Sequence, residues 1–110
     1  MDYTLTIEDV LRIIKNADYK NIQIVRRFKN ELFMAKRKIC ELDIIQAVKE
    51  LEVTDLIAGP IEDDDANRKH PVWIFKKKAF KVMCYIKLKV INKNRTVIVI
   101  SFHEDERREA

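Results

Sequence analysis

Four polar side chains near the C-terminal end of the sequence could together carry out proton transfer on a phosphate ester. Tyr85 and Lys87 are two residues apart, and Ser101 and His103 repeat this spacing further along the chain. A ribonuclease that works without a metal needs a group to take the proton of a ribose 2′-hydroxyl, a group to protonate the leaving 5′-oxygen, and a cation to stabilise the phosphorane. His103 is the leading candidate for proton transfer, Tyr85 could share that role or orient the phosphate, and Lys87 could supply the charge.

Alternating side chains predict the strands that must position these residues. Three segments rich in β-branched and aromatic residues are expected to be strands. They are Val72–Lys77, Phe80–Ile91 and Thr96–His103, and in the last of these Ile98, Ile100 and Phe102 are expected to face the core.

The register of the last two strands follows from burial. A one-residue slip would send every side chain to the opposite face, so the apolar even-numbered positions of both strands must coincide. A three-residue loop over 93–95 gives such a register. It sets Tyr85 opposite His103 and Lys87 opposite Ser101, with facing Cβ atoms about 5 Å apart. The alternative interpretation is an ordinary solvated sheet face.

The first half of the chain has helical patterns. A capping box at Thr6–Asp9 begins one helix, Phe28–Lys38 forms a second with its apolar stripe on Phe28, Leu32 and Ala35, and a third follows Cys40 with Leu42, Ile45, Val48 and Leu51 in the core. The segment Tyr19–Arg27 could be a strand, an extended connection or a lead-in to the second helix. The apolar face of the first helix is expected to comprise Ile7, Val10, Ile13, Ile14 and Ala17.

A length of 110 residues allows one domain with one modest core. We expect a helical part at 1–58, an acidic loop at 59–71 beginning with the Gly-Pro pair, a β-sheet at 72–103 and a charged tail at 104–110. Helices followed by strands indicate an α+β fold in which N-terminal helices pack on a C-terminal antiparallel sheet.

The distribution of charge points to a polyanionic ligand. The net charge is +4, and the segment from Arg68 to Lys89 holds many basic residues and no acidic one. A basic β region suits nucleic acid, although basic sheets also occur as solvated or edge-protecting faces. The residues expected to contact RNA are Arg68, Lys76, Lys77, Lys89 and Ser101.

Several classes of site and location are disfavoured. The two cysteines, Cys40 and Cys84, have no metal-ligand spacing, so we expect no metal site and no catalytic thiol. A single glycine leaves no phosphate-binding glycine loop, which argues against a nucleotide cofactor. The chain has no long apolar stretch and no signal-peptide pattern, so we expect a cytoplasmic protein with no membrane partner.

The amino-acid sequence of the C-terminal half resembles that of one known family. PVWIF at 71–75, CYIKLKV at 84–90, VIVISFHEDE at 97–106 and the upstream LEVTDLIAGPIEDDD at 51–65 are similar to the MqsR family of toxins from bacterial type II toxin–antitoxin modules. The resemblance covers roughly residues 28–106. It implies a RelE-like fold, metal-independent cleavage of single-stranded mRNA, and inhibition by a cognate antitoxin.

The resemblance also assigns roles to individual residues. The family's functional Tyr corresponds to Tyr85, with a basic residue at Lys87, and a functional basic position corresponds to His103, where the founding member has Lys. Two positions depart from the family pattern, because a functional Gln is replaced by Ile74 and a functional Lys aligns with Ala58. The alternative to a toxin endoribonuclease is a non-catalytic module that binds nucleic acid or a protein partner.

Overall fold

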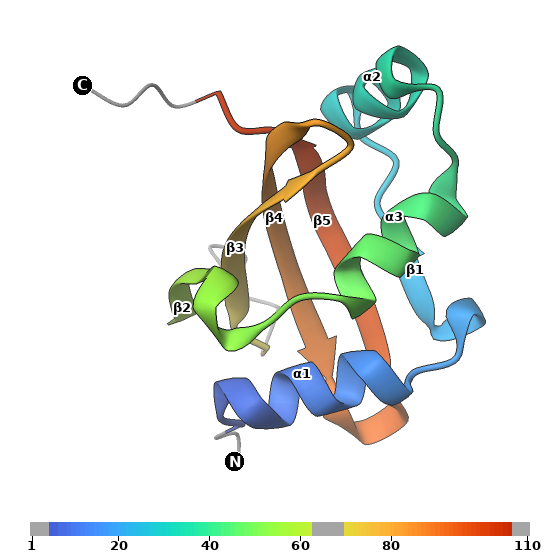
Figure 1. Cartoon of the computed structure of the whole chain (residues 1–110). Coiled ribbons are helices and arrows are strands. Elements are labelled where there is room, and N and C mark those ends of the chain that lie inside the picture. The colour runs from blue at the N-terminus through green and yellow to red at the C-terminus, as the bar shows by residue number, and fades with distance from the viewer. Residues whose placement is uncertain (1–4, 63–69, 107–110) are drawn as a thin grey trace.

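The computed structural model describes residues 5–62 and 70–106, which form three α-helices and one five-stranded sheet (Figure 1). The helices are α1 (Ile7–Asn16), α2 (Phe28–Arg37) and α3 (Glu41–Lys49), and the strands are β1 (Ile22–Ile24), β2 (Leu56–Ile61), β3 (Val72–Ala79), β4 (Val82–Ile91) and β5 (Thr96–Glu104). The strand order is β1-β5-β4-β3-β2, with β1 parallel to β5 and the other neighbours antiparallel. The predicted α+β class is confirmed. None of the helices in the described part of the chain is long and apolar enough to cross a membrane.

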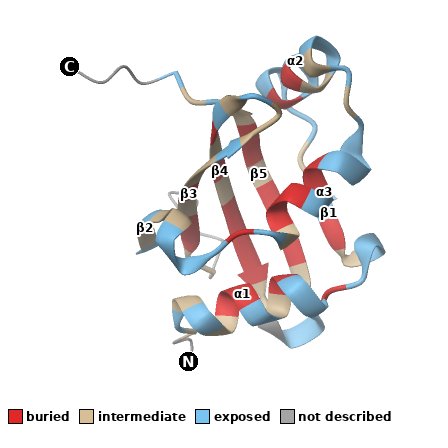
Figure 2. Cartoon of the chain, viewed as in Figure 1, coloured by how far each residue is buried: buried red, intermediate tan, exposed pale blue. Residues whose placement is uncertain are grey.

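The core lies between the helices and one face of the sheet. Figure 1 shows α1 and α3 in front of the strands, with α2 beside the C-terminal end of β5. Figure 2 shows that buried residues concentrate on the inner sides of α1 and α3 and along β3, β4 and β5. Phe75 in β3, Ile86 and Leu88 in β4, and Phe102 in β5 are all fully buried. The opposite face of the sheet is therefore the one that can present polar groups.

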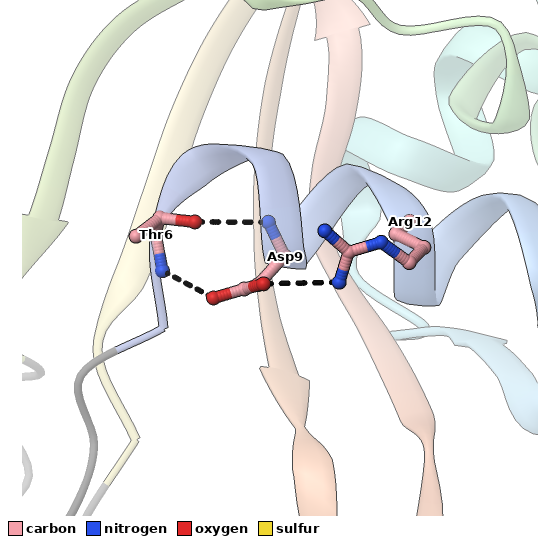
Figure 3. Close-up of polar contacts among 3 residues, drawn as sticks. All are labelled: Thr6, Asp9 and Arg12. Atoms are coloured by element: carbon pink, nitrogen blue, oxygen red, sulfur yellow. Dashed lines mark hydrogen bonds and ion pairs between the residues drawn. The ribbon is translucent and has the colours of Figure 1, made fainter.

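The predicted capping box begins α1 (Figure 3). The backbone N–H of Asp9 donates to the Thr6 hydroxyl at 3.1 Å, and the backbone N–H of Thr6 donates to the Asp9 carboxylate at 3.0 Å. Arg12 donates to the same carboxylate at 3.0 Å. The hydrogen bond from the Thr6 backbone, with a smaller contribution from Arg12, lowers the pKa of Asp9. The predicted apolar residues of this helix are all in or against the core.

The second helix forms as predicted, but its buried face is different. Phe28 is 78% exposed and Leu32 is 44% exposed, whereas Asn30 and Phe33 are buried. The helix is turned so that the ring of Phe33 packs on those of Phe80 and Phe102, with centroid separations of 6.2 and 5.9 Å. The packing of this aromatic cluster, rather than the apolar stripe of the helix, determines which side of α2 is buried.

The third helix also forms, and one of its predicted core residues is wrong. Leu42 is 59% exposed, while Ile45, Val48 and Leu51 are buried as expected. Ile44 is fully buried in its place. The buried side of α3 is formed by Ile44, Ile45 and Val48, and Leu42 lies outside it.

One strand lies within the part that was predicted to be helical, and a second begins in it. The undecided segment after Tyr19 becomes a short 3₁₀ turn followed by β1, and β2 crosses the predicted boundary at residue 58. Gly59 and Pro60, predicted to start a loop, lie inside β2 and are joined by a cis peptide bond. Proline is tolerated because β2 is an edge strand. Gly59 has φ of +136°, and a Cβ atom there would lie 3.0 Å from the Trp73 ring, so only glycine fits.

The pairing of β4 with β5 contains two differences from the predicted hairpin that cancel each other. The loop has four residues, since Ile91 pairs with Thr96, and a one-residue bulge follows Lys87 in the register. Beyond the bulge, Tyr85 pairs with His103 and Lys87 with Ser101, as predicted. On the hairpin side of the bulge the core residues of β5 are Val97 and Val99, so the prediction for Ile98 and Ile100 is wrong. A bulge shifts the alternation of side chains by one residue.

Candidate functional site

The candidate site lies on the face of the sheet that α1 and α3 do not cover. Three side chains form a row across neighbouring strands, because Lys76 of β3 pairs with Tyr85 of β4, and Tyr85 pairs with His103 of β5. The rings of Tyr85 and His103 are stacked, with centroids 5.6 Å apart and an angle of 28° between the planes. All three residues are half-buried. The row therefore combines an acid or base pair with a cation at a partly exposed surface.

The imidazole of His103 is held by a backbone carbonyl. Its Nδ1 lies 3.0 Å from the carbonyl oxygen of Glu104. A carbonyl oxygen can only accept, so Nδ1 is the donor, and in the neutral ring the lone pair then resides on Nε2. Nε2 is thus the atom of His103 suited to accept a proton from a substrate.

A second row lies next to the first and contains Lys87. Lys87 pairs with Ile74 of β3 on one side and with Ser101 of β5 on the other. The hydroxyl of Ser101 accepts a hydrogen bond of 3.2 Å from Nη1 of Arg27, and Ser101 is only 6% exposed. Arg27, which the sequence analysis did not select, therefore adds a guanidinium to this face beside Lys87. Ser101 holds that guanidinium rather than offering a free hydroxyl to a ligand.

The two departures from the MqsR pattern occupy neighbouring positions in this second row. Ala58 of β2 pairs with Ile74, and Ile74 pairs in turn with Lys87. Both residues are partly exposed. The functional Gln of the family would thus fall beside Lys87 and the functional Lys one strand further away, where this chain has two apolar side chains.

The three lysines predicted to contact RNA have different surroundings. Lys76 lies on the candidate face, but its Nζ is 2.8 Å from Oδ2 of Asp105, whose side chain is 5% exposed. Lys77 points to the opposite face, since it pairs with the buried Cys84, and its Nζ lies 3.9 Å from the carboxylate of Asp55. The placement of Lys77 does not fit the prediction, because strand alternation puts successive lysines on opposite faces.

Two further predicted RNA contacts cannot be assigned to the exposed surface. Lys89 lies on the candidate face but is only 4% exposed, so it is enclosed rather than presented to a ligand. Arg68 lies outside the described residues.

The cysteines and the tryptophan have structural positions. Cys84 is fully buried, and burial raises the pKa of its thiol to about 11, so the reactive thiolate is suppressed at neutral pH. Cys40 is exposed and its backbone N–H donates to the Asp43 carboxylate at 2.9 Å at the start of α3. Trp73 is 3% exposed and belongs to the core. The burial and raised pKa of Cys84 fit the prediction that this thiol is not a nucleophile, whereas for the exposed Cys40 it stays a prediction.

One positioning residue was missed by the sequence analysis. Asn30 of α2 is 1% exposed, and its amide nitrogen donates to the carbonyl oxygens of Val25 at 2.9 Å and Ile100 at 3.0 Å. Its amide oxygen accepts from the N–H of Phe102 at 2.9 Å. Asn30 thus bridges the backbone on both sides of Ser101, where the β5 bulge resets the register. A polar residue one turn before Phe33 on the same helical face was the available signal.

Comparison with known proteins adds no relative. No protein-family model, no curated protein and no solved structure matches this chain. A function is therefore proposed from the geometry of the site and the amino-acid sequences of its strands.

Proposed function

We propose that this protein is a metal-independent endoribonuclease that cleaves single-stranded mRNA, acting in the cytoplasm as the toxin of a type II toxin–antitoxin pair. The observation that carries the proposal is the stacked Tyr85–His103 pair, which lies in one row with Lys76 and next to the row of Lys87 on the uncovered face of the sheet. The resemblance to the MqsR family supports the same residues. The antitoxin is proposed from that resemblance alone.

The proposed reaction is an internal transfer at phosphorus. Nε2 of His103 takes the proton of the ribose 2′-hydroxyl, and the 2′-oxygen attacks the adjacent phosphorus. Lys87 stabilises the negative charge of the phosphorane. The bond to the 5′-oxygen then breaks, and the Tyr85 hydroxyl gives its proton to that oxygen. The products are a 2′,3′-cyclic phosphate and a free 5′-hydroxyl, so water and a metal are not needed for the cleavage step.

The proposal is tested by incubating the purified protein with labelled single-stranded RNA in excess EDTA. Cleavage should persist in EDTA and fall by about 10²-fold or more in His103→Ala and in Tyr85→Phe, which is the usual contribution of a general acid or base. Matched controls are His70→Ala and Tyr19→Phe, which change the same residue types elsewhere in the chain and should cleave like the original protein. Full cleavage by both site variants would contradict the assignment, and loss of cleavage in EDTA would contradict metal independence.

A non-catalytic nucleic-acid-binding module is the second candidate, and a specific observation favours it. The amine of Lys76 is paired with Asp105, and the apolar Ile74 lies beside Lys87, with Ala58 one strand further away. Under this alternative the protein would bind RNA with an affinity that falls steeply with salt and would yield no product. A stable complex with an acidic protein and no RNA affinity would instead indicate a partner-binding module.

A further inference from the structure

A pocket of about 410 Å³ lies next to the candidate site, between α2 and the C-terminal end of β5. Its lining comprises Lys29, Leu32, Phe33, Lys36 and Arg37 from α2, and His103, Glu104, Asp105 and Glu106 from the other side. The volume is within the range of pockets that hold small organic ligands, about 300–1,000 Å³. None of the α2 residues was among the predicted RNA contacts.

The helix places two lysines and an apolar side chain on the wall of this pocket. Lys29, Leu32 and Lys36 share one helical face, because they are spaced at i, i+3 and i+7. Seven residues span roughly 10 Å along a helix axis, so the two amines can serve separate anionic groups. Arg37 is less available, since it donates to the carbonyl oxygen of Phe80 at 3.3 Å.

The pocket and the candidate site share His103. A polymer strand whose phosphate lies at the Tyr85–His103 pair would therefore continue directly into the pocket. The lining combines three basic side chains with the exposed side of Leu32, and it also holds three carboxylates, of which Asp105 and Glu106 are paired with lysines of the chain. Nucleic-acid grooves combine charge for the backbone with apolar contact for the bases. This combination and the shared His103 favour a nucleotide over an acidic peptide as the occupant.

Carboxylates of the chain itself form ion pairs with lysines at both ends of this region. Oε1 of Glu106 lies 2.8 Å from Nζ of Lys29, and the hydrogen bond from Lys29 lowers the pKa of Glu106. Asp105 holds Lys76 at 2.8 Å, and its backbone N–H donates to the carbonyl oxygen of Met83 at 2.8 Å. Carboxylate and phosphate oxygens are equivalent partners for an ammonium group. The side chain of Glu106 is exposed whereas that of Asp105 is buried, so Glu106 can leave more readily than Asp105.

We propose that this pocket binds a nucleotide of single-stranded RNA adjacent to the scissile phosphate, with Lys29 and Lys36 contacting the backbone and Glu106 displaced from Lys29. The inference rests on the proposed function, and it states where one nucleotide of the RNA substrate binds. In the free protein Glu106 is paired with Lys29, so RNA must displace this carboxylate when it binds. The pocket thus extends the substrate path from the sheet onto α2.

The test measures binding of a fluorescent 2′-O-methyl oligonucleotide by anisotropy at several salt concentrations. This analogue has no 2′-hydroxyl and cannot be cleaved, so the readout is independent of catalysis. The double variant Lys29→Gln/Lys36→Gln should bind about tenfold or more weakly, and its salt slope should fall by roughly 1.4, which corresponds to two lost phosphate contacts. The control Lys20→Gln/Lys93→Gln has the same charge change on exposed residues at the other end of β5 and should bind like the original protein.

The carboxylate is tested separately. Glu106→Gln should tighten binding severalfold because it releases Lys29 without changing the shape of the side chain. Glu8→Gln makes the same change at an exposed position on α1 and should have little effect. An unchanged affinity in Glu106→Gln would overturn the displacement of this carboxylate.

Three results would overturn the pocket as an RNA site. They are equal losses in both double lysine variants, no loss in the pocket variant, and binding of a poly-glutamate peptide in place of the oligonucleotide. Cleavage that depends on His103 together with any of these results would leave the proposed function intact. Selective loss of binding in the pocket variant, in a protein that never cleaves RNA, would instead support the pocket and reject the endoribonuclease.

Discussion

The face of the sheet beneath α1 and α3 is mostly apolar and buried, whereas the opposite face carries two stacked rings and several cations. Phe102 and His103 are neighbours in β5 and illustrate the difference. Phe102 is fully buried against the rings of Phe33 and Phe80, and His103 is half-buried against Tyr85. A single step along the strand therefore changes a side chain from a contributor to stability into a candidate for chemistry.

The largest expected effect on stability comes from the covered face. Phe102→Ala should lower the free energy of unfolding by about 3–5 kcal/mol, because it empties the centre of an aromatic cluster. His103→Ala, one residue away, should change it by less than about 1 kcal/mol while removing the cleavage activity. Urea unfolding of both variants checks this contrast. Equal losses of stability would break the distinction between the two faces.

Asn30→Ala tests how the bulge in β5, which sets the face of each later side chain, is held in place. We expect the free energy of unfolding to fall by about 2–4 kcal/mol. The substitution leaves buried backbone groups of Val25, Ile100 and Phe102 without their partner. RNA cleavage should fall at the same time, since the segment that carries His103 loses its anchor. Asn16→Ala, at an exposed position of α1, is the control and should stay within about 0.5 kcal/mol. A loss below about 1 kcal/mol in Asn30→Ala would show that the bulge holds without it.

The activity proposed for the polar face should increase when the groups that the resemblance implies are added to it. Ile74→Gln combined with Ala58→Lys places an amide beside Lys87 and an ammonium one strand further along the same row. We expect the rate of RNA cleavage to rise by about tenfold, equivalent to ~1.4 kcal/mol of activation free energy. Single-turnover cleavage in EDTA is the measurement. A slower reaction with unchanged RNA affinity would mean that this row does not face the reacting phosphate.

The smallest expected effect lies at the capping box that begins α1 (Figure 3). The pKa of Asp9 is lowered in the folded protein, so its contribution to stability is present above about pH 4 and is lost as the pH falls through the folded pKa. Asp9→Asn should therefore be less stable than the original protein at pH 7, and the difference should shrink at pH 3. Urea unfolding at both pH values measures it. A difference that grows in acid would contradict the direction of the shift.

Local patterns in the sequence were sufficient for the elements whose determinants are close together in the chain. The capping box of Thr6 and Asp9 involves residues three apart, and the alternation that places Tyr85 and Lys87 on one face involves residues two apart. The pairing of Tyr85 with His103 was also predicted correctly. It was reached through a three-residue loop without a bulge, whereas the structure has a four-residue loop and a bulge that compensate for each other.

Only the tertiary structure decided which side chains can meet a ligand. The parallel pairing of β1 with β5, the rotation of α2 around Phe33 and the insertion of Asn30 beside the bulge all depend on contacts between residues distant in sequence. The same holds for the pairs Lys76–Asp105 and Lys29–Glu106, which determine how much positive charge remains available. Amphipathic periodicity reports only that a segment has a buried side. Which side that is, and which charges face each other across the fold, follows from packing the whole chain.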